Sequence, residues 1–164
     1  MAHQVKKSVM RIRRFKADDK EAAAHVVERA EKITLQPYYH KKLIDWYCEY
    51  NSAANLLKHA REVDLFLVAY RVATKDIVGL ITLKGDEIER FFVDPAHQKR
   101  GIGTRLFKRL LKYARAKRLK QLRVESSLYA ASVYESLGFK KKGRIKKKHA
   151  GLVYYNIAYS KQLD

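Results

Sequence analysis

The N-terminal third of the chain shows one extended pattern followed by helical ones. Residues 9–15 alternate loosely between apolar and basic side chains, which predicts a strand. Asp18 or Asp19 is then placed to cap a helix that runs to about Lys32, and Pro37 is predicted to open a second helix. The apolar positions at helical spacing are Ala22, Val26, Val27 and Ala30, then Leu43, Trp46, Tyr47 and Tyr50, then Leu56 and Leu57 behind a cap at Ser52.

From residue 65 onward, short runs rich in β-branched and aromatic residues predict strands. A long amphipathic helix is predicted over 103–118, and a short one over 130–137, where Gly138 is suited to a left-handed cap. We find no internal repeat, linker or boundary, so residues 1–164 are expected to form one mixed α/β domain with helices on the faces of one sheet. The predicted strands are 65–71, 77–83, 87–93, 121–125, 139–145 and 152–159.

Composition supports a folded domain and adds a strong positive charge. Of 164 residues, 47% are hydrophobic and 11% aromatic, which is too apolar for a disordered basic tail. Lys and Arg number 36 against 17 Asp and Glu, so the formal net charge is +19 and an anionic partner is expected. Such partners include nucleic acid, an anionic membrane surface and a phosphorylated ligand.

Several classes of protein are excluded by what the sequence lacks. The single cysteine, Cys48, rules out an internal disulfide framework and a cysteine-based zinc cluster, and the histidines show no metal-ligand spacing. No apolar run approaches the roughly 20 residues of a spanning helix. Residues 1–7 lack the apolar core of a signal peptide, so a cytoplasmic location without membrane association is expected.

The most informative segment joins the predicted strand 87–93 to the helix that follows. Gly101 and Gly103 open this helix beside Lys99, Arg100 and Arg105, an arrangement that suits a phosphate or pyrophosphate. A P-loop is excluded because its Gly-Lys-Ser/Thr element is absent. A dinucleotide-binding loop lacks its third glycine, although Glu125 lies near where a ribose-binding acid belongs. By themselves, the two glycines are also compatible with a plain helix start.

Three segments together resemble the GCN5-related N-acetyltransferase (GNAT) family. Residues 98–103 (QKRGIG) match its Gln/Arg-x-x-Gly-x-Gly/Ala signature, residues 90–95 (RFFVDP) resemble the strand leading into it, and residues 131–139 (ASVYESLGF) resemble its closing Tyr-x-x-Leu-Gly-Phe element. The resemblance implies an acyl-CoA N-acyltransferase-like fold with a mostly antiparallel sheet of about seven strands. Residues 33–64 lie outside the recognisable part, in the region where the family's acceptor site varies.

The resemblance also implies a cofactor site for acetyl-CoA, which is a cosubstrate, and no metal. Backbone groups of the strand would pair with the pantetheine, and backbone N–H groups of the loop would bind the pyrophosphate. The residues implied in cofactor binding are Phe91, Phe92, Val93, Gln98, Lys99, Arg100, Gly101, Ile102, Gly103 and Thr104. Many relatives carry Asn near position 129, where this chain has Tyr129, so that contact is in doubt.

Direct acetyl transfer to an amine needs a base, an oxyanion donor and an acid for the leaving thiolate. The resemblance implies Tyr134 as the acid. It places Glu87 at a position where several members have the base, with Glu89 as the alternative and a water chain also possible. Alternation on the strand predicts that both acids share a face with Phe91 and Val93. The oxyanion donor would be the N–H of Phe92 or Val93, at a bulge.

Several features have a simpler explanation beside the functional one. Cys48 has no catalytic partner and is expected to be core or partly buried. Most of the aromatics Tyr38, Tyr39, Trp46, Tyr47 and Tyr50 are expected in the core, and some against the acceptor. The basic run 140–148 is placed to contact the CoA 3′-phosphate, RNA or an acidic protein, and its affinity for nucleic acid would fall steeply with salt.

The sequence therefore predicts an acetyl-CoA-dependent N-acetyltransferase for a primary amine on a small molecule or a protein, active as a monomer or homodimer. The competing hypothesis is a basic module that keeps this fold to associate with RNA or ribosomes and has little catalysis. The glycine signature together with Tyr134 favours the enzyme.

Overall fold

A computed structural model describes residues 9–164, so the predicted absence of a leader at 1–7 lies outside the described residues. Seven strands form one sheet in the order β1-β2-β3-β4-β5-β7-β6. Their bounds are Met10–Arg14 (β1), Leu65–Arg71 (β2), Ile77–Lys84 (β3), Glu87–Val93 (β4), Gln121–Ser126 (β5), Lys140–His149 (β6) and Leu152–Gln162 (β7). The predicted sheet and its element order are confirmed, with β4 and β5 as the parallel pair.

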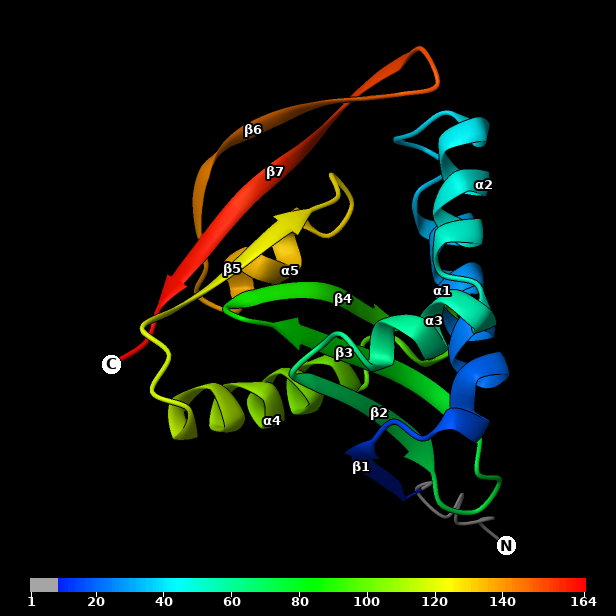
Figure 1. Cartoon of the computed structure of the whole chain (residues 1–164), viewed down its shortest axis with the longest axis vertical. Helices are drawn as coiled ribbons and strands as arrows, with labels where there is room; N and C mark the ends of the chain where they lie inside the picture. The colour runs from blue at the N-terminus through cyan, green and yellow to red at the C-terminus, as the bar shows by residue number, and fades with distance from the viewer. Residues whose placement is uncertain (1–8) are drawn as a thin grey trace, which may run out of the picture.

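Helices cover both faces of the sheet (Figure 1). On one face, α1 (Lys20–Thr34), α2 (Lys41–Tyr50) and α3 (Ala53–Ala60) follow one another, and α1 and α3 pack on β2 and β3 through Val27, Leu56 and Leu80. On the other face, α4 (Ile102–Ala116) buries Leu106 and Leu110 in the largest hydrophobic cluster. The short helix α5 (Ala131–Ser136) adds Tyr134 to this same cluster.

The sheet opens between its two central strands. β4 and β5 are paired only at Glu87 with Arg123 and at Ile88 with Val124, after which the strands separate. Beyond that point β4 is paired with β3 alone, so its backbone groups that face β5 have no strand partner. In an ordinary sheet these groups would be satisfied by the neighbouring strand. The fold therefore presents a free strand edge in the middle of the sheet, as the resemblance implied.

A bulge in β4 reverses the expected alternation of its side chains. Thr82 pairs with Arg90 and Leu83 with Ile88, which leaves Glu89 as the extra residue on β4. Ile88 and Phe91 consequently pack in the same cluster beside α4, although they are three positions apart and would lie on opposite faces of a regular strand. The prediction that Glu87 shares a face with Phe91 and Val93 is therefore wrong, and the bulge lies at Glu89 rather than at Phe92 or Val93.

Two predicted boundaries also differ from the structure. Pro37 lies in a turn, and α2 begins at Lys41 after His40, whose ring nitrogen accepts a hydrogen bond from the Lys42 N–H (3.1 Å). The predicted strand 139–145 is longer in the structure: β6 contains the whole basic run 140–148, and a tight turn with positive φ at Ala150 and Gly151 leads into β7. In α1, Ala22 was predicted in the buried stripe but is exposed, and Ala23 is buried instead.

Candidate active site

A single large cavity of about 870 Å³ occupies the opening between β4 and β5. Its walls come from β4, the loop 98–104, α5, the helices α1 and α2, and the far end of the β6–β7 hairpin. Apart from Arg100, every residue predicted in the site lines this cavity: Glu87, Glu89, Phe91, Phe92, Val93, Gln98, Lys99, Gly101, Ile102, Gly103, Thr104 and Tyr134. The structure thus brings together residues that the sequence spreads over nearly fifty positions.

The glycine loop presents a helix N-terminus to the cavity. Gly101 caps α4 with a φ of +79°, in the left-handed region where a side chain is strained. The first intrahelical bond runs from the Arg105 N–H to the Gly101 carbonyl (3.0 Å), so the preceding N–H groups have no acceptor within the helix. These groups and the helix dipole suit a phosphate group, with the ammonium of Lys99 in the same wall.

Tyr134 lies in the cavity wall with its side chain packed among aromatic rings. The ring is 6% exposed and makes edge contacts with Phe91 and Phe139 at centroid distances of 6.1 Å and 5.5 Å. Among the residues that the structure describes, none hydrogen-bonds to the Tyr134 hydroxyl. Burial raises the pKa of this hydroxyl, so it keeps its proton at neutral pH. A protonated hydroxyl held by packing alone is available to donate to a ligand in the cavity.

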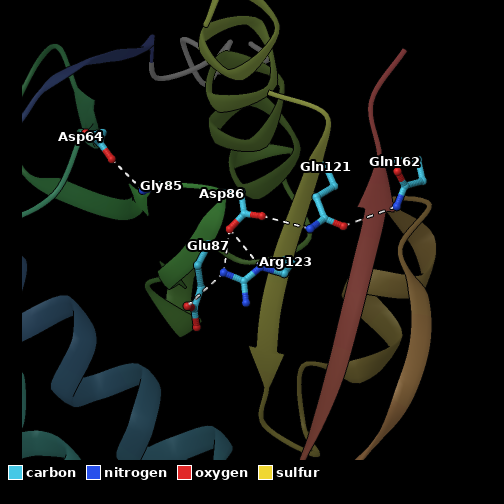
Figure 2. A network of polar contacts seen from close by, with 7 residues as sticks. All are labelled: Asp64, Gly85, Asp86, Glu87, Gln121, Arg123 and Gln162. Carbon is cyan, nitrogen blue, oxygen red and sulfur yellow. Dashed lines mark hydrogen bonds and ion pairs between the residues drawn. The ribbon is translucent and has the colours of Figure 1, made fainter. Parts of the chain in front are cut away.

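The acids at 86–89 are already paired with basic side chains, as Figure 2 shows for the first two. Arg123 on β5 contacts Asp86 at 2.7 Å and Glu87 at 3.9 Å. Gln121 adds a hydrogen bond to Asp86 (3.1 Å), and Glu89 lies 3.4 Å from Arg90. This network joins β4 to β5 where the two strands are still paired. These ion pairs therefore largely neutralise the charge of Asp86, Glu87 and Glu89.

A buried polar network that the sequence analysis missed lies deeper in the same cavity. Glu31 on α1 is 2% exposed, and its Oε1 accepts a hydrogen bond from Asn51 Nδ2 (2.9 Å). Asn51 Oδ1 accepts in turn from Arg90 Nε (2.8 Å), and the Arg90 guanidinium reaches His59 on α3. The side chain of Arg90 also lies over the Tyr50 ring, 5.3 Å from its centroid.

The surroundings of Glu31 raise the pKa of two groups, the Glu31 carboxyl group itself and the Cys48 thiol. Burial raises the pKa of Glu31 to about 7, although contacts with Cys48, Asn51 and Arg90 oppose the rise. Burial, together with the Glu31 charge, raises the pKa of the Cys48 thiol to about 12, so the thiol is not a nucleophile at neutral pH. Cys48 is partly buried, as predicted. A sequence signal for Glu31 existed: it follows Val27 by one helical turn, within the apolar stripe of the helix.

Aromatic side chains build the wall opposite the glycine loop. Trp46 stacks near Tyr50 (5.6 Å) and His149 (4.2 Å), and Tyr47 makes an edge contact with Tyr154 (6.4 Å). All five of these side chains line the cavity, whereas Tyr39 is both core and cavity wall. The prediction that most of the aromatics are core therefore holds only in part. At the mouth, the Tyr129 hydroxyl donates to Gln98 Oε1 (3.1 Å), so Tyr129 makes a contact of its own in place of the family's Asn.

The dinucleotide-binding alternative loses its support in this geometry. Glu125, considered as a ribose-binding acid, is held by Lys147 (2.6 Å) and Asn156 (2.9 Å). Within residues 9–164, no cluster of His, Cys, Asp and Glu has the arrangement of a metal site. Over the same residues, none of the helices combines the length and the apolar character needed to cross a membrane.

Comparison with known proteins decides the family. The model of the acetyltransferase (GNAT) domain matches residues 34–160, including nearly all of the segment 33–64 that the motifs left unmatched. The chain belongs to the GNAT family. No curated protein sequence matches at a significant level.

Solved structures of other GNAT proteins share the fold. A GCN5-related N-acetyltransferase from Rhodopseudomonas palustris is 24% identical and superposes with a TM-score of 0.85, covering 95% of this chain and 97% of its own. The PaiA N-acetyltransferase from Thermoplasma acidophilum, in complex with coenzyme A, is 21% identical with a TM-score of 0.78, covering 94% and 99%. YncA from Salmonella typhimurium, with its cofactor acetyl-CoA, is 21% identical with a TM-score of 0.68, covering 96% and 95%.

Proposed function

We propose that this GNAT protein transfers the acetyl group of acetyl-CoA directly to a primary amine of a small molecule or a protein. The observation that carries the proposal is the free edge of β4, which opens into the same cavity as the N-terminus of α4 and the Tyr134 hydroxyl. Similar structures with coenzyme A or acetyl-CoA bound support the same ligand for this chain.

The residues of the cavity fit the parts of that cosubstrate. The backbone of Phe91, Phe92 and Val93 would pair with the pantetheine amides as an added strand, in place of β5. N–H groups from Arg100 to Thr104 would bind the pyrophosphate, although the Arg100 side chain stays outside the lining. When bound, acetyl-CoA supplies the thioester carbonyl that the amine attacks. The Val93 carbonyl already accepts a hydrogen bond from Gln98 Nε2 (3.2 Å), a bond that pantetheine pairing would replace.

Each step of the transfer has a candidate group. The Tyr134 hydroxyl would protonate the leaving thiolate, and its raised pKa favours that role. The N–H of Phe92 or Val93 remains the proposed oxyanion donor, without the bulge that was expected there. Glu87 and Glu89 are the bases that the resemblance proposes, but each already lies in an ion pair, Glu87 with Arg123 and Glu89 with Arg90.

The basic strand β6 does not by itself support nucleic-acid binding. Its lysines are mostly exposed along an edge strand, where charged side chains hinder pairing with other chains. The proposed contact of 140–148 with nucleic acid or an acidic protein stays secondary to catalysis. It predicts an affinity that falls steeply as salt is raised.

Calorimetry and an amine panel test the proposal. We expect acetyl-CoA to bind saturably and CoA to be released only when a suitable primary amine is present, measured with a thiol reagent and confirmed by the mass of the product. Arylalkylamines, polyamines and N-terminal peptides form the panel. A chain that binds no acetyl-CoA, or binds it and acetylates none of these amines, would contradict the proposal.

A further inference from the structure

One carboxylate in the cavity wall has an oxygen without a partner. Glu31 Oε1 accepts a hydrogen bond from Asn51, but within residues 9–164 Glu31 Oε2 is buried and has no hydrogen-bond partner. Burying an unpaired acceptor costs about 1–3 kcal/mol. An unpaired buried acceptor in a native protein therefore usually has a structural or functional explanation. The residue also interrupts the apolar stripe formed by Val27 and Ala30, where an apolar side chain would serve the packing of α1 better.

The other carboxylates that line the cavity differ from Glu31. Glu87 is paired with Arg123, Glu89 with Arg90, and Glu125 with Lys147 and Asn156. Each of these acids therefore has a cation within 4 Å. Glu31 has no cation in direct contact among the described residues, and Arg90 reaches it only through the amide of Asn51.

The network around Glu31 fixes its carboxyl group in place. Arg90 donates to the Asn51 carbonyl oxygen, which holds the amide with its NH2 group toward Glu31, so the three side chains form one chain of donors and acceptors. This arrangement orients Oε1 and leaves Oε2 as the free acceptor. Other groups around it are the Cys48 thiol from α2 and, on its own helix, Glu28. Trp46, Tyr47 and Tyr50 line the same part of the cavity and supply apolar surface for a substrate.

We propose that Glu31 accepts the proton that the acceptor ammonium must lose before acetyl transfer, a proposal that rests on the function proposed above. The ammonium gives one proton to Glu31 Oε2 and becomes a neutral amine. Its nitrogen lone pair then forms the C–N bond as the C–S bond of the thioester breaks. Tyr134 gives its hydroxyl proton to the leaving thiolate. The nitrogen loses a second proton, which returns to the Tyr134 oxygen through water, and Glu31 releases the first proton to water.

The titration of Glu31 agrees with this assignment. A base works best when its pKa lies near the working pH, and burial places that of Glu31 at about 7. The charged groups that face it are Arg90, which favours the carboxylate, and Glu28, which opposes it. The carboxylate form is therefore available at and above neutral pH and is lost below it.

The test compares Glu31→Gln with Glu28→Gln, since both residues are on α1 and Glu28 is exposed and paired with Lys32. Glutamine keeps an oxygen for the Asn51 hydrogen bond, so the variant should fold, which circular dichroism checks. With an amine taken from the panel, we expect kcat/KM of the wild type to rise with pH through about 7. Glu31→Gln should lose that rise and about 100-fold in kcat/KM, with unchanged acetyl-CoA affinity by calorimetry. Glu28→Gln should keep the rise with pH and the rate above it, with the midpoint of the rise moved slightly to lower pH because a charge that opposes the Glu31 carboxylate is gone.

A second substrate separates proton acceptance from a structural role. An amine whose conjugate acid has a pKa well below the assay pH is already neutral and needs no prior deprotonation, so Glu31→Gln should slow its acetylation much less than that of a strongly basic amine. Equal losses with both amines, or a pH profile unchanged by Glu31→Gln, would overturn the assignment while leaving the acetyltransferase proposal intact. A wild type that acetylates no amine would overturn both.

Discussion

The two walls of the cavity are built on different principles. The wall formed by the end of β4, the loop 98–104 and the start of α4 offers mainly backbone groups: a free strand edge and a helix N-terminus. The wall formed by α1, α2 and the β6–β7 hairpin offers side chains, with the aromatics Trp46 and Tyr47 and the network of Glu31, Asn51 and Arg90. We refer to them as the backbone wall and the side-chain wall.

This difference decides how strongly each wall depends on the identity of its residues. A strand edge and a helix N-terminus bind amides and phosphates through groups that every residue carries, so few residue types are constrained there. The side-chain wall depends on residues from distant segments whose identities set the chemistry of the pocket. We therefore expect substitutions in the side-chain wall to affect stability and proton transfer more strongly than those at the strand junction near Arg123.

Replacing Arg90 by Leu should give the largest effect. The Arg90 side chain is 3% exposed. Removing the guanidinium leaves the Asn51 carbonyl oxygen without its hydrogen-bond donor and leaves Glu31 without the nearest cation in the network. Breaking a buried charge network in this way costs about 3–5 kcal/mol. Urea unfolding at constant m-value should show a loss of that size in the free energy of unfolding. A loss below about 1 kcal/mol would mean that the network contributes little to the side-chain wall.

Replacing Glu31 by Gln should change stability in the opposite direction and raise the free energy of unfolding. Because burial raises the Glu31 pKa from 4.5 to about 7, folding favours the protonated acid, and the charged form destabilises the fold above that pH. The variant is expected to be more stable than the wild type by up to about 3 kcal/mol at pH 8. The gain should shrink as pH falls through 7 and vanish below about 4.5, where both states are protonated. A variant less stable than the wild type at pH 8 would contradict the raised pKa.

Tyr134→Phe should lower turnover with little effect on stability. The ring contacts with Phe91 and Phe139 are kept, and only a hydroxyl without a described partner is removed. Loss of a general acid costs about 100-fold or more in kcat, or about 2.7 kcal/mol of transition-state stabilisation. Steady-state kinetics with the amine from the panel measure the loss. Tyr129→Phe, whose hydroxyl contacts Gln98 at the mouth, is the control and should keep kcat within a few-fold.

The backbone wall could be predicted from the sequence because it is local. Gly101, Gly103 and the strand before them lie within seventeen consecutive positions, and Gly138 follows α5 in the left-handed conformation that was predicted. The spacing of hydrophobic residues predicted the order of strands and helices correctly, because that spacing is a local property of the sequence. The resemblance then identified the residues that lie around the opening.

The side-chain wall could not be predicted in the same way. Glu31, Asn51 and Arg90 meet only after α1, α2 and β4 have packed, and no local pattern places them together. The bulge at Glu89 has no signature in the sequence, yet it reverses which face Glu87 occupies. The ion pairs of Arg123 with Asp86 and Glu87 depend on the parallel alignment of β4 and β5, so the sequence alone does not show that Glu87 lies beside a cation.

Arg123→Gln should give the smallest loss of stability. It tests which interactions hold β4 and β5 together where the cavity begins. The guanidinium is half exposed and paired with Asp86 at 2.7 Å, and such surface pairs contribute less than about 1 kcal/mol. The hydrogen bond from Arg123 lowers the Asp86 pKa below its ordinary value of 3.8, so the pair stabilises the fold near neutral pH. That contribution disappears as pH falls through the lowered pKa, and about 1 M salt should also reduce it. A stability loss comparable to that of Arg90→Leu would show that the ion pairs of Figure 2, rather than the strand pairing of Glu87 and Ile88, hold β4 and β5 together where the cavity begins.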